Sequence, residues 1–225
     1  SCGSVHIHCA DPTQHPLIRA NYLDNEHDRN ALVAAVHAHT DRLDILMNNA
    51  GITWGAPLGD FPFKAWEKVM NVNVAGMFDL TQKLLPMLRA SGSVDDPARV
   101  INVGSVMGER EMGDGAYSYS MSKAAVHHMT RILGKELAGE AITVNALAPG
   151  PFVSRMTAFA THDEDTRRKV GKDVPLKRVG RDEDIGGCML FLCGRGGAYV
   201  TGAIIPVSGG INVMSGPNIF EQALH

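Results

Sequence analysis

Short apolar runs alternate with longer segments of helical spacing along this chain. Runs rich in β-branched residues predict strands, and apolar positions three or four residues apart predict helices. The expected strands cover residues 5–9, 17–23, 43–47, 100–103, 141–147 and 203–207, and the expected helices cover residues 29–39, 63–89, 117–138 and 182–193. Strands that alternate with helices of ten or more residues indicate βαβ units. The pattern therefore predicts an α/β fold with a parallel sheet covered on both faces.

Residues that can take part in binding or catalysis directly follow several of these strands in the sequence. Asn49, Ser105 and Pro149 each follow an expected strand, and ligands of parallel sheets bind at the carboxyl ends of the strands. Tyr119 and Lys123 lie four residues apart on an expected helix, so both can point into one pocket that Ser105 also reaches. This combination indicates a proton-transfer site for carbonyl and alcohol chemistry. An isolated Tyr–Lys pair more often belongs to a solvated helix face, so the other motifs must decide.

A second tyrosine precedes the pair. Four residues beyond Tyr117 stands Met121, which carries no charge, so Tyr117 cannot form the same pair. The separation of Ser105 and Tyr119 leaves room for a loop that contains several glycines between the strand and the helix. Tyr119 is therefore the candidate proton donor.

Composition narrows the class of protein. The chain has 225 residues, 44% of them hydrophobic and 20% charged, which is typical of one soluble globular domain spanning residues 1–225. Its net charge of −3 gives no reason to expect a nucleic-acid or membrane-surface partner. No apolar run approaches the roughly 20 residues that cross a bilayer. The amino terminus also lacks the basic and apolar segments of a secretory signal, so we expect a cytoplasmic protein.

The four cysteines do not form a metal-binding pattern. Cys2, Cys9, Cys188 and Cys193 lack the spacing of a zinc site, so no metal site is expected. Cys188 and Cys193 lie in an apolar helical segment and are interpreted as buried free thiols. Free thiols suit a reducing compartment.

Several motifs occur in a characteristic order along the chain. They cover residues 44–51, 71–73, 100–105, 119–123, 144–145, 149–150, 180–185, 201–202 and 209–210. In this order the chain resembles the short-chain dehydrogenase/reductase family, and within it the 3-oxoacyl carrier-protein reductases of the rhamnolipid-synthesis type. The resemblance implies a Rossmann-like, doubly wound parallel sheet. It also implies an NAD(P)(H)-dependent oxidoreductase that interconverts a ketone and a secondary alcohol, with a 3-oxoacyl thioester as the expected substrate.

The resemblance assigns roles to individual residues. Tyr119 would exchange a proton with the substrate oxygen, and Ser105 would hydrogen bond that oxygen. Lys123 would hold the ribose hydroxyls of the cofactor. Together with an oxidised nicotinamide it would lower the pKa of the phenol, whose ordinary value is about 10. Asn73 would hold a water that relays protons from Lys123, with Asn71 as the competing assignment.

Further residues would contact the cofactor. Those that the resemblance implies, beyond Tyr119 and Lys123, are Asn49, Ala50, Gly51, Pro149, Gly150, Val153 and Ser154. The segment from Asn49 would lie along the ribose and adenine side, and Val153 and Ser154 would hold the nicotinamide carboxamide. The alternative for the second segment is ordinary turn chemistry at a strand end, because Gly and Pro favour turns.

One family motif does not occur in this sequence. No Gly-x-x-x-Gly-x-Gly turn is present, although such a turn holds the cofactor pyrophosphate on backbone amides. The residues before Asn48 supply little more than the second and third strands, so the first β-α unit is expected to be missing. A trimmed fragment, a protein that has lost catalysis, and the omission of internal stretches all remain open.

The cofactor, the assembly and the rival functions complete these expectations. Asp11 would favour NAD, whereas reductases of the resembled subgroup use NADPH, so NADP is favoured over NAD. The helices at 63–89 and 117–138 resemble those that pair between subunits, which predicts a homodimer or homotetramer. The rival function is an inactive binding or scaffold protein of the same fold, and a further alternative is epimerisation or dehydration on this fold.

Overall fold

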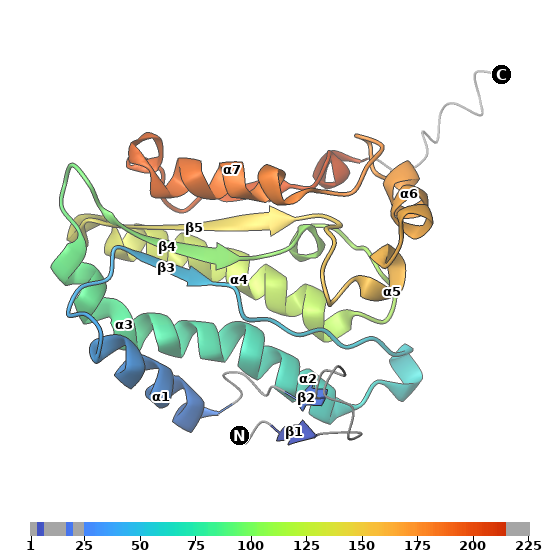
Figure 1. Cartoon of the computed structure of the whole chain (residues 1–225), viewed down its shortest axis with the longest axis horizontal. Helices are drawn as coiled ribbons and strands as arrows, with labels where there is room; N and C mark the ends of the chain where they lie inside the picture. Colours follow the sequence, from blue (N-terminus) through green and yellow to red (C-terminus); the bar gives the residue numbers. More distant parts are fainter. Residues whose placement is uncertain (1–3, 7–16, 20–24, 215–225) are drawn as a thin grey trace.

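A four-stranded parallel sheet forms the centre of the computed structural model, which describes residues 4–6, 17–19 and 25–214 (Figure 1). Its strands run in the order β3 (Ile45–Asn48), β4 (Ala98–Val103), β5 (Ile142–Pro149) and β6 (Ile204–Val207). Because all four strands are parallel, their carboxyl ends lie at the same edge of the sheet. The segments that the sequence predicts to bind ligands follow the strands at this edge.

Helices cover both faces of this sheet. α3 (Gly76–Ser91) and α4 (Tyr117–Leu137) lie on one face, and α7 (Asp182–Cys193) lies on the other (Figure 1). Neighbouring residues of β4 explain both layers, because successive side chains of a strand point to opposite faces. Val100 packs in the cluster that contains Leu84, and Ile101 packs with Leu192 of α7. The predicted Rossmann-like α/β fold is therefore confirmed.

The predicted helix at 63–89 is built from three pieces. α2 (Phe63–Met70) runs into a π-helical turn, η2 (Asn71–Ala75), which continues into α3. Such π-turns occur frequently at functional sites. Here the turn contains Asn73, whose side chain is buried and bonded to the backbone of Ile52.

The first two strands do not join the central sheet, so the prediction that they supply its second and third strands is wrong. β1 (Ser4–His6) pairs antiparallel with β2 (Leu17–Arg19) in a separate two-stranded sheet. A parallel pair needs a crossover of about a dozen residues or more, and the segment 7–16 is shorter than that. The remaining positions of the two predicted strands lie outside the described residues.

The other elements frame the sheet. α1 (Glu26–His37) packs on α3, where Arg29 Nε lies 2.6 Å from Asp79 Oδ2. The polar stretch after β5 forms α5 (Ala158–Thr161) and α6 (Glu164–Asp173), and Asp163 caps α6 by accepting the Thr166 N–H at 2.7 Å. Short 3-10 turns are η1 (Leu58–Asp60), η3 (Val106–Gly108), η4 (Ala138–Glu140), η5 (Arg195–Gly197) and η6 (Ile211–Val213).

Two further observations concern expectations from composition. Cys188 and Cys193 are free thiols, as expected, but both are half-buried rather than fully buried. They lie on α7, at the rim of the cluster around Leu192. Among the helices of the described ranges, none combines the length and the apolar character that spanning a bilayer requires.

Candidate active site

The three residues expected to transfer a proton meet at the carboxyl edge of the sheet. Ser105 follows β4 and forms the N-cap of η3, while Tyr119 and Lys123 come from the first turns of α4. Ser105 and Lys123 are buried, and the Ser105 side chain hydrogen bonds to Tyr119. Lys123 Nζ lies 5.6 Å from the centre of the Tyr119 ring. The structure therefore brings these side chains together at this edge of the sheet.

Lys123 is a buried cation with a neutral partner. Its Nζ donates a hydrogen bond of 2.7 Å to the Val103 carbonyl, which accepts one of the three N–H donors of an ammonium group. Burial lowers the pKa of Lys123 from 10.5 to about 8. No carboxylate of the described residues forms an ion pair with it, so its remaining donors suit the hydroxyls of a ligand.

The phenol of Tyr119 has a raised pKa in the protein alone. Burial raises the pKa of the Tyr119 phenol above 10.0, and the hydrogen bond from Ser105 acts in the opposite direction. The expected lowering of this pKa by Lys123 together with an oxidised nicotinamide stays a prediction, and in the protein alone removal of the phenol from water is the largest effect. The phenol is therefore protonated at neutral pH, which is the form that donates a proton.

Asn73 lies next to this pocket. Its Oδ1 accepts the Ile52 N–H at 2.9 Å, and its Nδ2 donates to the Ile52 carbonyl and to Ser122 Oγ, both at 2.9 Å. A Cβ atom at Gly51 would lie 3.5 Å from Lys123 Nζ and 3.6 Å from Asn73 Oδ1. Gly51 thus separates Asn73 from Lys123 by the width of one small residue, and the side chain of Asn73 holds the segment after β3 in place.

The expected cofactor segments flank the pocket on two sides. Asn49 and Ala50 follow β3 and line a cavity of about 150 Å³ together with Leu32 and Met47. On the other side, Gly150 passes close to the end of β6, since a Cβ there would lie 2.9 Å from the Cα of Ser208.

Val153 and Ser154 lie in the exposed loop that continues from the Pro149–Gly150 turn. Val153 exposes 46% of its surface. Ser154 Oγ lies 2.9 Å from Thr157 Oγ1, and this hydrogen bond closes a local turn. This segment therefore forms a local turn, and because the loop is exposed it can also contact a cofactor.

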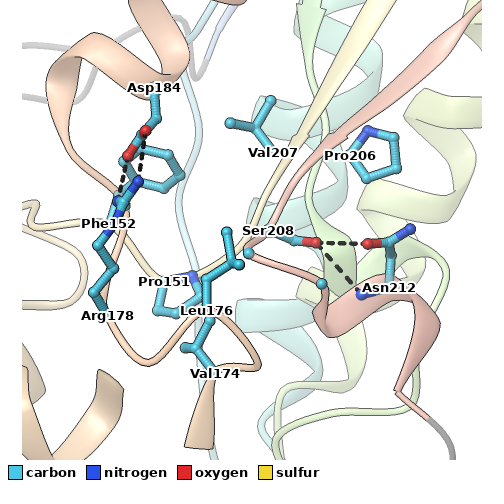
Figure 2. Close-up of a pocket in the computed structure, with 13 residues that line it drawn as sticks. Pro151, Phe152, Val174, Leu176, Arg178, Asp184, Pro206, Val207, Ser208 and Asn212 are labelled. Carbon is cyan, nitrogen blue, oxygen red and sulfur yellow. Dashed lines mark hydrogen bonds and ion pairs between the residues drawn. The ribbon is translucent and has the colours of Figure 1, made fainter. Parts of the chain in front are cut away.

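A larger cavity lies near the same edge, but outside the proton-transfer group. It measures about 290 Å³ and is lined by Pro151, Phe152, residues of β6 and the loop after it, the segment before α7, and Asp184 of α7 (Figure 2). Ser105, Tyr119 and Lys123 are not among its lining residues.

One ion pair at this cavity was missed by sequence reasoning. Arg178 donates to both oxygens of Asp184 at 2.6 and 2.9 Å, a bidentate pair that joins the segment before α7 to its first turn (Figure 2). The only local signal is the acidic start of α7, which also fits a helix N-terminus.

Comparisons with known proteins complete this description. The family model described as Enoyl-(Acyl carrier protein) reductase matches residues 11–212. The chain is 47% identical over 191 residues to the rhamnolipids biosynthesis 3-oxoacyl-[acyl-carrier-protein] reductase of Pseudomonas aeruginosa, covering 85% of this chain and 75% of that protein. It is 37% identical over 195 residues to the 3-oxoacyl-[acyl-carrier-protein] reductase FabG of Thermotoga maritima, covering 84% of this chain and 76% of that protein.

Solved structures give the same picture. The Pseudomonas aeruginosa RhlG/NADP active-site complex matches with a TM-score of 0.81 and 46% identity, covering 85% of this chain and 75% of that chain. A gluconate 5-dehydrogenase from Burkholderia cenocepacia in complex with NADP and tartrate matches with a TM-score of 0.77 and 28% identity, covering 86% and 74%.

Proposed function

This chain belongs to the short-chain dehydrogenase/reductase family, whose members are NAD(P)-dependent oxidoreductases of alcohol and carbonyl groups, and we propose that it reduces the ketone of a 3-oxoacyl thioester with NADPH. The observation that carries the proposal is that Ser105, Tyr119 and Lys123 lie together at the carboxyl edge of the sheet, with Ser105 and Lys123 buried. The relatives named for 3-oxoacyl-[acyl-carrier-protein] reduction support the substrate class.

The proton transfer follows from the two hydroxyl groups. Ser105 and Tyr119 lie close enough to interact, so their two hydroxyls can together hold a ketone oxygen by two hydrogen bonds. The raised pKa of Tyr119 keeps the phenol protonated, and it acts as the general acid that protonates the oxygen of the reduced product. When bound, NADPH supplies the hydride that reduces the carbonyl carbon.

Lys123 and Asn73 then serve the cofactor and the return of the proton. The donors of Lys123 that remain beside the Val103 bond would hold the ribose hydroxyls. Its pKa of about 8 also lets it pass a proton toward Tyr119 at physiological pH. Asn73, in the π-turn, is our assignment for the residue that holds the relay water.

The residues fit the nicotinamide half of NADP. A buried cation with free donors and the small residue Gly51 in front of it provide a charge and a space for a ribose. Asn49, Ala50, Pro149, Gly150, Val153 and Ser154 are the further proposed contacts. NADP is preferred to NAD because solved relatives bind NADP. Asp11, which would favour NAD, lies outside the described residues.

The rival proposal was a binding or scaffold protein without catalysis. The comparisons give it no support, since the named relatives are reductases and dehydrogenases. It would predict no binding of NADPH or NADH, which calorimetry on the protein measures directly.

We also propose that the protein forms a homodimer or homotetramer through α3 and α4. Phe78 of α3 and Met121 and Ile132 of α4 expose 45%, 56% and 49% of their surfaces, more apolar area than a monomer needs. Light scattering that shows a stable monomer would exclude this assembly. The free thiols of α7 support a reducing compartment, such as the cytoplasm, as the location of the protein. We propose that residues 1–225 form one domain.

The activity is tested with purified protein, NADPH and acetoacetyl coenzyme A. We expect loss of NADPH absorbance coupled to formation of the 3-hydroxyacyl thioester, identified by mass spectrometry, and a lower rate with NADH. A protein that binds NADPH but leaves this thioester unchanged would exclude the proposed substrate class, and one that binds neither cofactor would favour the scaffold.

A further inference from the structure

A histidine lies directly beneath the loop that carries Ser105. His127 stands on α4, one turn beyond Lys123, and only 2% of its surface is exposed. The backbone N–H of Ser105 donates a hydrogen bond to His127 Nε2 at 3.4 Å. We propose that His127 is a positioning residue for the reduction, which holds the Ser105 backbone so that the serine hydroxyl faces Tyr119. This inference rests on the proposed function.

Two glycines beside Ser105 make room for the imidazole ring. A Cβ at Gly104 would overlap His127 Nε2, and a Cβ at Gly108 would lie 2.9 Å from His127 Cε1 as well as against the backbone of α4. Neither glycine has a positive φ, so backbone conformation does not explain their presence. The loop on both sides of Ser105 is therefore shaped to accept the ring at close range.

The contacts of the ring define its tautomer. Nε2 accepts the Ser105 N–H, so the hydrogen of the neutral ring is on Nδ1. Nδ1 forms no hydrogen bond to any of the described residues, but Glu109 Oε1 lies 3.5 Å away and attracts an N–H there. The Glu109 carboxylate thus favours the tautomer in which Nε2 is the acceptor.

The surroundings of the ring also keep it neutral. Burial, together with the positive charges of Arg131 and Lys123, lowers the pKa of His127 to about 4. A protonated ring would point an N–H at the N–H of Ser105 and break the contact. At neutral pH the acceptor is therefore present throughout the reaction.

The same serine is fixed at its side chain as well. Ser105 Oγ accepts the Met107 N–H at 3.1 Å, and the hydroxyl hydrogen bonds to Tyr119. These contacts hold the backbone and the oxygen of Ser105 in place. A shift of about 1 Å in such a group can reduce the rate about a hundredfold, so support of the backbone affects turnover.

The test uses two substitutions at one position and a neighbouring control. His127→Leu removes the acceptor and leaves the buried Ser105 N–H without a partner, whereas His127→Gln keeps an amide oxygen that can accept it. His128→Leu changes the next residue, which is exposed. With acetoacetyl coenzyme A we expect His127→Leu to lower kcat about tenfold or more while the Kd for NADPH stays within about twofold. His127→Gln should recover most of the rate, and His128→Leu should match the unsubstituted protein.

Equal kcat values for His127→Leu and the unsubstituted protein would overturn the inference. Equally low values for His127→Leu and His127→Gln would overturn it too, because that result would indicate a requirement for ring shape alone. Circular dichroism and the unfolding temperature establish that each variant is folded at the assay temperature.

A readout without turnover separates this inference from the proposed function. Nitrogen NMR of labelled protein should show a neutral His127 with hydrogen on Nδ1, and Glu109→Gln should weaken that preference. If the tautomer is found but the thioester is not reduced, the proposed function fails and the contact stands. If hydrogen is found on Nε2, the inference fails even in an active enzyme.

Discussion

Replacement of Lys123 by methionine should stabilise the protein while it abolishes catalysis. Methionine has a similar length and no charge, so it fills the same space without the cost of holding an ammonium group away from water. Lys123 is 3% exposed, and within the described residues its Nζ donates one hydrogen bond, to the Val103 carbonyl. The charge of Lys123 therefore costs the fold stability.

The size of the effect follows from the pKa of Lys123. This pKa falls from 10.5 to about 8 on folding, and each pH unit corresponds to about 1.4 kcal/mol, so the charged group destabilises the fold by about 3 kcal/mol at pH 7. Loss of the bond to the Val103 carbonyl costs about 1 kcal/mol in return. The net gain of about 2 kcal/mol should raise Tm by about 4–8 °C for a chain of this size.

Urea unfolding of Lys123→Met and of the unsubstituted protein measures this gain as a function of pH. The folded protein binds the Lys123 proton more weakly than the unfolded chain, so the stability of the unsubstituted protein rises between about pH 8 and pH 10.5. The advantage of the variant should shrink over that window. Lys135→Met, an exposed change on the same helix, should alter stability by less than about 0.5 kcal/mol. A less stable Lys123→Met protein, or a gain that does not change with pH, would refute the reasoning.

Two further predictions concern the supports of the site. Asn73→Ala removes three hydrogen bonds to Ile52 and Ser122. It should lower the free energy of unfolding, measured by urea titration, by about 2–3 kcal/mol. A loss below about 0.5 kcal/mol would show that these bonds do not hold the segment after β3 in place. Asp184→Asn breaks the pair with Arg178, which holds the pKa of Asp184 below its ordinary value of 3.8. Its Tm should be lower than that of the unsubstituted protein at pH 7, with the difference closing as the pH falls below 3.8; a difference that persists in acid would contradict an ionic origin.

Part of this structure could be read from local patterns. The continuous apolar run that includes Val100 and Ile101 predicts a strand buried on both faces, and both side chains have no exposed surface. The spacing of Tyr119 and Lys123 places them on one face of α4, and Ser105 follows from the strand end. These features depend on periods of two and of about four residues, which the sequence displays directly.

Other features depend on contacts between distant residues. The apolar spacing of the sequence gives no sign of the π-turn at Asn71–Ala75. This turn coincides with hydrogen bonds from Asn73 to the segment after β3. The raised pKa of Tyr119 in the protein alone comes from burial, which cannot be read from the spacing of residues. The sequence alone does not distinguish His127 from other residues on a buried helix face. Its role becomes apparent from the close approach of Gly104 and Gly108 to its ring.

The antiparallel pairing of β1 and β2 is a different case, because the sequence did contain the signal. The segment 7–16 is shorter than a parallel crossover requires, so an antiparallel pair was the better prediction. The roles of the individual site residues stay predictions, since geometry alone does not measure a role in turnover.

The most direct measurement is the turnover of Tyr119→Phe beside Tyr117→Phe. Both variants lose one phenolic hydroxyl from the start of α4, but the Tyr117 ring packs edge-on against Phe61 with ring centres 5.7 Å apart. With acetoacetyl coenzyme A and saturating NADPH, Tyr119→Phe should lose at least about a hundredfold in kcat with unchanged cofactor affinity, and Tyr117→Phe should retain near-normal turnover. Equal turnover of Tyr119→Phe and the unsubstituted protein would contradict proton transfer by this phenol.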